Sequence, residues 1–191
     1  HPERFTLQKL EKVEKTLKLQ SYLRKNGFSC PKPFDFNGQY ILQEENIRFV
    51  VMEYIEGNLA VPGTMTNNQL YNLGKSTGYM HRVLSSINTK TPLKEDWKPS
   101  KYEMEEKWAN NWTNAQLNQH SIRVYEALVK QKEILDRIDF QLFLDCNMGW
   151  THWDLWADNI LFQSNQVSAI LDFDRMRYVY PELDVSRAIL S

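Results

Sequence analysis

The sequence predicts an α+β protein of two lobes, on three observations. Leu10, Val13 and Leu17 recur at helical spacing among charged residues, which predicts a helix over 6–26 that ends at Asn26-Gly27. An apolar β-hairpin follows, and the rest of the chain has mostly helical patterns, interrupted by a second hairpin near its C-terminal end. A helix, a small sheet and a largely helical part in that order indicate segregated helices and strands.

The first hairpin is expected from strands at 39–43 and 47–54, with 44–46 at the turn. Its apolar run, 49–52, predicts a strand buried on both faces. Thr66 and Gln69 resemble a capped helix start after a loop at 57–63. The remaining expected elements, in chain order, are a helix from 66 to about 84, an irregular connection over 85–101, helices over 102–112 and 114–138 with the second extended to Cys146, strands over 159–162 and 167–171, and a last helix from about Pro181.

Composition limits the classes of function. With 191 residues and 42% hydrophobic content, the chain suits one compact domain or two small lobes that share a cleft. Its 23 basic and 24 acidic residues nearly cancel, so we expect neither nucleic acid nor a membrane surface as a partner. Cys30 and Cys146 have no metal or redox spacing, which favours free thiols and a cytoplasmic location. No secretion signal is visible, but the chain opens with His1 rather than Met, so an upstream segment stays open.

The clearest chemical signal is an ordered set of polar residues near the C-terminal end. His152, Asp154 and Asn159 are followed, after an apolar hairpin, by Asp172 and Asp174. Pairing of the two strands brings Asn159 and Asp172 to the same end, where their oxygens suit Mg²⁺. Asp154 lies on a loop and can accept the proton of a substrate alcohol during phosphoryl transfer. Asp174 is a candidate for a second metal or for substrate, and His152 for structural support of the loop.

These residues resemble the catalytic loop and metal motif of the aminoglycoside phosphotransferase and choline kinase superfamily. That family has the pattern His-x-Asp-x-x-x-x-Asn, followed by an apolar-Asp-apolar-Asp motif. The resemblance implies a protein-kinase-like fold with a partial N-terminal lobe and hinge over 1–57, and a helical C-terminal lobe over 58–191. It also implies transfer of the γ-phosphate of ATP or GTP, with Mg²⁺, to a hydroxyl of a small molecule.

The resemblance assigns roles to two further segments. In the hinge, it implies that the Glu53 carbonyl and the Ile55 amide meet the adenine edge, with Met52 behind it. Asp184, at the head of the last helix, is implied to brace the catalytic loop. His81 is expected to be a packed helix residue rather than a ligand.

Several features of the family are missing from this sequence. Neither a phosphate-covering hairpin nor a strand lysine precedes the first helix, and Lys9, Lys12 and Lys15 are expected to form its solvated face. Thr16 falls near the position of the family's helix glutamate, with Glu14 the nearest acid. The family also continues with further helices, so the chain resembles the middle of a kinase.

The acceptor pocket is expected between the first helix of the large lobe and the catalytic loop. Met104, Trp108 and Trp112 form one helical stripe, which indicates core packing or an aromatic wall for a sugar or cationic ligand. Trp97 and Trp150 belong to the same aromatic set, and Trp153 and Trp156 flank Asp154. Aminoglycosides, macrolides, choline and other amino alcohols or sugars are candidate acceptors. A catalytically impaired pseudokinase that binds nucleotide or acts as a scaffold, and a metal-dependent phosphoesterase, are the alternatives.

Overall fold

The computed structural model describes residues 7–87 and 99–190, which fall into two compact units. The first unit comprises 1–94 and 148–191, and the second comprises 95–147. This division follows the packing and does not test the lobe boundary after residue 57, which stays a prediction. Within the described ranges, no helix combines the length and apolar character that crossing a membrane requires.

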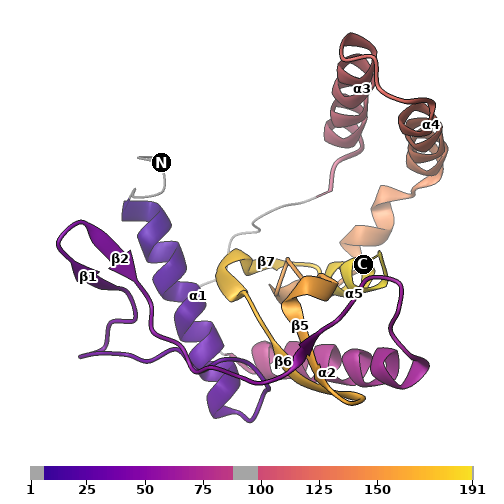
Figure 1. Ribbon diagram of the computed structural model, residues 1–191. Helices are drawn as coiled ribbons and strands as arrows, with labels where there is room; N and C mark the ends of the chain where they lie inside the picture. Colours follow the sequence, from indigo (N-terminus) through magenta and orange to yellow (C-terminus); the bar gives the residue numbers. More distant parts are fainter. Residues whose placement is uncertain (1–6, 88–98, 191) are drawn as a thin grey trace. The chain divides into compact units, whose positions relative to one another are not determined.

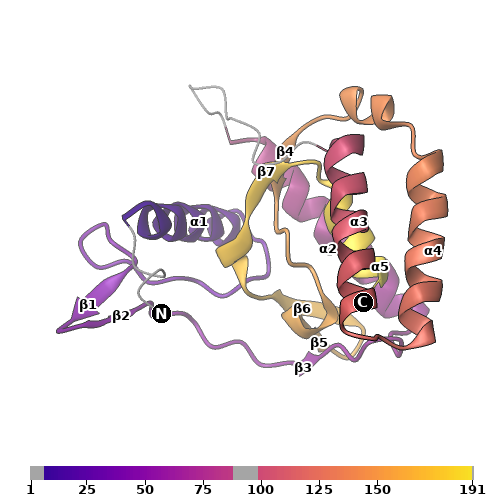
Figure 2. The same cartoon turned by 90° about the horizontal axis from the view of Figure 1, so that it is seen from above.

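Figure 1 labels the helices of the first unit and its strands β1, β2, β5, β6 and β7, and Figure 2 also labels β3 and β4. In chain order the elements of this unit are α1 (Leu7–Lys25), β1 (Leu42–Glu44), β2 (Ile47–Phe49), β3 (Asn58–Leu59), α2 (Asn67–Ser85), β4 (Gly149–Thr151), the 3₁₀ turn η3 (Ala157–Asn159), β5 (Ile160–Gln163), β6 (Gln166–Ile170), the 3₁₀ turn η4 (Phe173–Arg175), β7 (Arg177–Val179) and α5 (Glu182–Leu190).

The expected hairpin near the C-terminal end is present and belongs to a three-stranded antiparallel sheet in the order β3-β5-β6. Its register pairs Ile160 with Ile170, one residue from Asn159 and two from Asp172. β3 adds to the free edge of β5, although the sequence indicated only a loop there. Figure 2 shows β3, β5 and β6 side by side. The sheet therefore joins the segment that follows the hinge to the hairpin that carries the metal motif.

The core of this unit lies where α2 packs against β4 and β6, and where α1 packs against η4 and α2. Phe28, Met80, Ile160 and Ile170 are almost fully buried there. Burial of each such side chain contributes about 1.5–3 kcal/mol, so the motif hairpin is anchored by its own apolar strands. The predicted capping box of α2 is confirmed, since Thr66 accepts from the Gln69 amide while the Gln69 side chain accepts from the Thr66 amide.

The prediction that 49–52 forms a strand buried on both faces is wrong. β2 ends at Phe49, and Phe49, Val51 and Met52 are 39%, 38% and 43% exposed. The hairpin pairs only β1 with β2, and a two-stranded ribbon has no second layer to cover its apolar side chains. Beyond β2 the chain instead pairs with 32–34, through hydrogen bonds from the Phe34 amide to the Val51 carbonyl and from the Glu53 amide to the Lys32 carbonyl, both 2.9 Å.

The second unit is a helical hairpin of α3 (Lys101–Leu117) and α4 (Ile122–Arg137), followed by the 3₁₀ turn η2 (Phe140–Leu144). The predicted break between two helices at residue 113 is wrong, because α3 continues through that residue to Leu117. It ends where the Asn118 side chain bonds back to the Asn114 carbonyl and Gln119 takes φ 48°. The predicted extension of α4 to Cys146 is also wrong, because Ile138 is extended and Asp139 caps η2 instead.

Aromatic side chains hold this hairpin together. The rings of Trp108 and Trp112 stack with centroids 5.4 Å apart, and Trp112 meets Tyr125 edge-on at 5.5 Å. The Trp108 indole N–H donates to the Leu128 carbonyl at 2.8 Å. The stripe predicted from sequence therefore packs α3 on α4. Trp97, from the same predicted aromatic set, lies outside the described residues.

Candidate active site

The predicted catalytic loop begins at the end of β4 and is held from both sides. β4 pairs with β7, with Thr151 opposite Arg177, and the Thr151 hydroxyl donates to the Arg177 carbonyl at 3.1 Å. This pairing places the start of the loop beside the residues that follow Asp174. Trp153 then takes φ 67°, a left-handed conformation that is unusual for a bulky residue and requires outside support.

That support comes from Asp184 on α5. Its carboxylate is fully buried and accepts the backbone amides of His152 and Trp153, each at 2.8 Å. It also accepts the Nε2–H of His81, on α2, at 2.9 Å. Three donors from two segments thus converge on one carboxylate. Asp184 was predicted to brace this loop, whereas its contact with His81 was not predicted, because a single histidine on a helix gives no sign of what it faces.

His152 is fully buried and links the loop to the metal motif. Its Nδ1 accepts the Asp154 amide at 3.2 Å, so the hydrogen lies on Nε2, which donates to the Leu171 carbonyl at 2.7 Å. The ring meets Phe173 edge-on with centroids 4.6 Å apart. Burial lowers the pKa of this imidazole below its usual value, against the opposing effect of Asp184. His152 is therefore a neutral crosslink between residues 154 and 171.

Asn159 and Asp172 lie at the same end of the hairpin. The Leu171 amide donates to the Asn159 carbonyl at 2.8 Å, which extends the β5–β6 ladder by one bond. The Asn159 side-chain amide donates to the Asp154 carbonyl at 2.8 Å, and this hydrogen bond does not involve the side-chain oxygen. Asp172 has φ 58°, a left-handed conformation that Asp tolerates better than most residues.

These two side chains have the chemistry of a Mg²⁺ site. Mg²⁺ needs only one or two protein oxygens when water and phosphate complete its shell, and both residues offer oxygen. In residues 7–87 and 99–190, no three His, Cys, Asp or Glu side chains form a ready cation site. A cation here would therefore depend on Asn159, Asp172 and a phosphate-bearing ligand together.

Asp154 is partly buried and forms an ion pair with Arg175. The distance from Arg175 Nε to Asp154 Oδ2 is 3.6 Å, and the two side chains are 65% and 17% exposed. The ion pair holds the carboxylate beside η4, to which Arg175 belongs. Arg175 was not predicted as a partner of Asp154, since an arginine just after an acidic motif is common on protein surfaces.

Asp174 interacts directly with Asp172. Partial burial raises its pKa to about 6, and a hydrogen bond and the negative charge of Asp172 act in the same direction. The two carboxyl groups are thus adjacent, which is the arrangement that a second cation beside Asp172 would need.

The segment predicted to be the hinge, 52–55, precedes β3, which pairs with β5. Neither the Glu53 carbonyl nor the Ile55 amide takes part in a backbone–backbone hydrogen bond with any described residue. The Glu53 side chain is held by Arg24, with contacts of 3.0 and 3.2 Å, and this ion pair lowers the pKa of the carboxyl. After the hinge, a Cβ added to Gly57 would stand 2.5 Å from Ser168 Oγ, so this backbone packs closely against the hairpin.

Helix α1 lies against the other side of the motif, at η4. Lys9, Lys12 and Lys15 are exposed as expected, but Lys15 Nζ also lies 4.6 Å from the Trp150 ring centroid. Glu14 accepts the Tyr40 and Ile41 amides at 3.3 Å. It therefore anchors the chain that leads to β1. Thr16 is buried and donates to the Val13 carbonyl.

The two tryptophans beside Asp154 have different surroundings. Trp153 lies between two guanidinium groups, Arg177 at 5.1 Å and Arg187 at 4.2 Å from its ring centroid. Trp156 is 37% exposed. Of the two, Trp156 is the one available to contact a ligand through an open ring surface.

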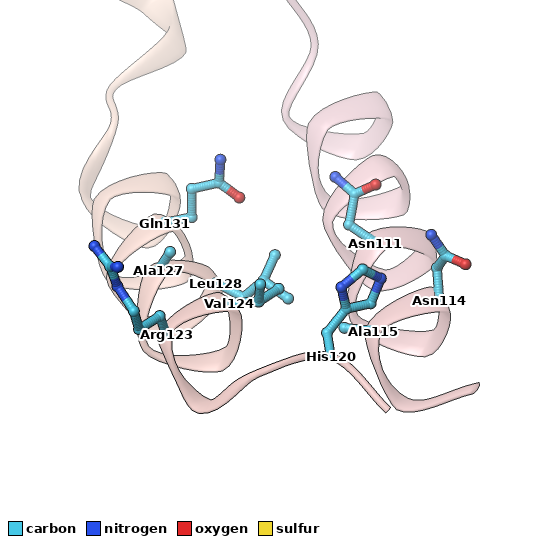
Figure 3. Close-up of a pocket in the computed structure, with 9 residues that line it drawn as sticks. All are labelled: Asn111, Asn114, Ala115, His120, Arg123, Val124, Ala127, Leu128 and Gln131. Atoms are coloured by element: carbon cyan, nitrogen blue, oxygen red, sulfur yellow. The ribbon is translucent and has the colours of Figure 1, made fainter. Parts of the chain in front are cut away.

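The second unit has a cavity of about 410 Å³ between α3 and α4, close to the turn that joins them (Figure 3). Amide and cationic side chains line it, with an apolar floor from α4. The polar lining residues are Asn111, Asn114, His120, Arg123 and Gln131. A lining of this kind offers hydrogen bonds to a hydroxylated ligand.

The fold is that of the protein-kinase-like proteins. The chain belongs to the phosphotransferase enzyme family, whose model matches residues 2–191. A search of curated proteins gives no match.

Solved structures of the same fold include several antibiotic kinases. The chain is similar to amicoumacin kinase hAmiN, determined with AMP-PNP, Ca²⁺ and Ami, with a TM-score of 0.62 at 18% identity over 98% of this chain and 54% of that one. It is similar to an aminoglycoside phosphotransferase from Alicyclobacillus acidocaldarius, with a TM-score of 0.61 at 16% identity over 92% and 57% of the two chains. For the phosphotransferase APH(3'')-Id from Streptomyces rimosus, determined with ADP and streptomycin, the TM-score is 0.59 at 14% identity over 96% and 68%. The chain thus spans about half the length of the kinase hAmiN.

Proposed function

We propose that the protein transfers the γ-phosphate of ATP or GTP to a hydroxyl of a small molecule. The observation that carries this proposal is a set of hydrogen bonds, 2.7–3.2 Å long, that links Asp154, Asn159 and Leu171, the residue before Asp172. The Asn159 side chain bonds the Asp154 carbonyl, its backbone bonds residue 171, and His152 ties residue 171 to Asp154. These bonds support the proposal because they hold together the backbone segments that carry the proposed proton acceptor and the two proposed cation ligands, and positional catalysis requires such order.

Each residue has a proposed step. Asp154 accepts the hydroxyl proton of the acceptor at its carboxylate, which forms an ion pair with Arg175. Asn159 and Asp172 hold Mg²⁺, with Asp174 beside them for a second metal or for substrate. When bound, Mg²⁺ neutralises the charge on the transferred phosphate. His152 and Asp184 keep the loop in its strained conformation.

The nucleotide is proposed to lie against the hinge. The Glu53 carbonyl and the Ile55 amide meet the adenine edge, and the exposed Met52 side chain covers the base. Support comes from the continuity of the chain, since this segment leads into β3, which pairs with the strand that follows Asn159. Complexes of the similar kinases with AMP-PNP or ADP favour ATP as the donor.

The acceptor is proposed to be an aminoglycoside or another amino alcohol. Two of the similar structures contain Ami or streptomycin, and the α3–α4 cavity of this chain has amide groups suited to hydroxylated ligands. A cytoplasmic location, where ATP is abundant, remains part of the proposal, and the two free thiols are consistent with it.

Substitution of the proton acceptor tests this function. Asp154→Asn is expected to reduce phosphate transfer by about 10²–10⁴-fold, the range for loss of a general base, and to leave the affinity for Mg²⁺–nucleotide unchanged. Transfer of radiolabelled phosphate to a panel of aminoglycosides and amino alcohols, with ATP and GTP as donors, measures the first effect. Titration calorimetry with AMP-PNP measures the second. Nucleotide binding without transfer to any acceptor would favour the pseudokinase, and neither binding nor transfer would reject both.

A further inference from the structure

A cavity of the first unit lies beside the proposed active site and has an unusual charge. Its volume is about 510 Å³, within the range of small-molecule pockets. Four cationic side chains line it, against one carboxylate, that of Asp174. The cations are Lys9, Lys12, Arg175 and Arg177. The lining residues therefore have a summed charge of +3, whereas the whole chain has a net charge of −1.

The cations come from separate segments and converge on one space. Lys9 and Lys12 are three residues apart on α1 and therefore share a helix face. Arg177 is the first residue of β7, and its guanidinium packs over the Trp153 ring at 5.1 Å. Arg175 belongs to η4 and is paired with Asp154. Like charges gathered in a concave site repel one another, and this repulsion is relieved when an anion binds.

We propose that this cavity binds a small molecule that carries an oxyanion, of the phosphate or carboxylate type. Arginine offers a planar fork that matches both groups, while lysine adds compact positive charge. The cavity is distinct from the proposed nucleotide site, because its lining contains neither the hinge residues nor Asn159 nor Asp172. Arg175 contacts both the cavity and Asp154, so the anion binds one side chain away from the proposed proton acceptor.

Inorganic phosphate is the first probe, measured by titration calorimetry at low salt without nucleotide or Mg²⁺. We expect saturable binding that weakens as NaCl is added, because salt screens partly exposed charges. The variant Lys12→Gln/Arg177→Gln lacks two charge-assisted contacts. We therefore expect its affinity for phosphate to be at least roughly tenfold lower than that of the unchanged protein. Lys18→Gln, which removes an exposed lysine of the same helix outside this cavity, is the matched control and is expected to bind as the unchanged protein does.

Acetate in place of phosphate identifies the source of the oxyanion: tighter binding of phosphate assigns a phosphate ester, and tighter binding of acetate assigns a carboxylate. If circular dichroism shows that the Arg177 substitution unfolds the protein, Lys9→Gln/Lys12→Gln, two exposed residues of α1, replaces it in the test. The proposal is overturned if neither anion binds saturably, or if the cavity variants bind as tightly as Lys18→Gln. Because nucleotide and Mg²⁺ are left out, this outcome is independent of whether the protein is a kinase.

Discussion

Replacing Asp184 by alanine is expected to lower the free energy of unfolding by about 4 kcal/mol. The buried carboxylate accepts the amides of His152 and Trp153 and the ring N–H of His81. A buried donor left without its partner costs about 1–3 kcal/mol, so three donors amount to roughly 3–9 kcal/mol before relaxation. Water can enter the space left by the carboxylate and reach part of the loop, which favours the lower part of that range.

Urea denaturation measures the loss, and a melting curve gives a second estimate. For a chain of this size each kcal/mol shifts the melting temperature by about 2–4 °C, so a decrease of about 8–16 °C is expected. Asp158→Ala is the matched control, because Asp158 is an exposed acid of η3 in the same loop region. Hydrogen exchange adds a local readout: the amides of His152 and Trp153 should exchange much faster in Asp184→Ala than in the control.

A loss of less than about 1 kcal/mol, equal to that of Asp158→Ala, would refute the reasoning, because a typical surface substitution has an effect of that size or less. Unchanged exchange at His152 and Trp153 would lead to the same conclusion. Either result would mean that the loop keeps the conformation of Trp153 without the α5 carboxylate.

Two further predictions concern titrating groups. Because the pKa of Asp174 is raised to about 6 from an ordinary 3.8, the folded state binds more protons than the unfolded state between these values. Without Mg²⁺, the contribution of Asp174 to the free energy of unfolding therefore falls as pH rises through that window. Urea denaturation at several pH values should show that Asp174→Asn lacks this part of the pH dependence. An unchanged pH dependence in the variant, or one of opposite sign, contradicts the assignment. Burial raises the pKa of the Cys30 thiol to about 12, while Cys146 is only half-buried, so iodoacetamide at pH 8 should alkylate Cys146 first and Cys30 only after unfolding. Mass spectrometry of the peptides decides, and rapid labelling of Cys30 in the folded protein would be the contrary result.

The sequence was sufficient to predict the elements around the motif. The apolar strands on either side of residues 164 and 165 leave few alternatives to a tight hairpin, so the positions of Asn159 and Asp172 at one end follow from pairing alone. The first helix and the capped start of α2 were also predicted within about one residue, because their signals are local.

What the sequence did not reveal depends on tertiary contacts. The apolar run at 49–52 indicated a buried strand, but burial depends on whether a second layer covers that strand. The described residues do not form such a layer over 49–52. The exact ends of α3 and α4 depend on capping by Asn118 and Asp139 rather than on periodicity. The partners His81 and Arg175 were missed because neither has a sequence signal tied to the residue that it contacts.

The location of the bound cation tests the proposed site most directly. Crystals of the protein grown with Mn²⁺, which substitutes for Mg²⁺, and AMP-PNP give an anomalous signal at the metal. A peak within bonding distance, about 2–2.3 Å, of the Asn159 side-chain oxygen and an Asp172 carboxylate oxygen is the predicted result. A bound nucleotide whose metal lies away from both residues would contradict the account.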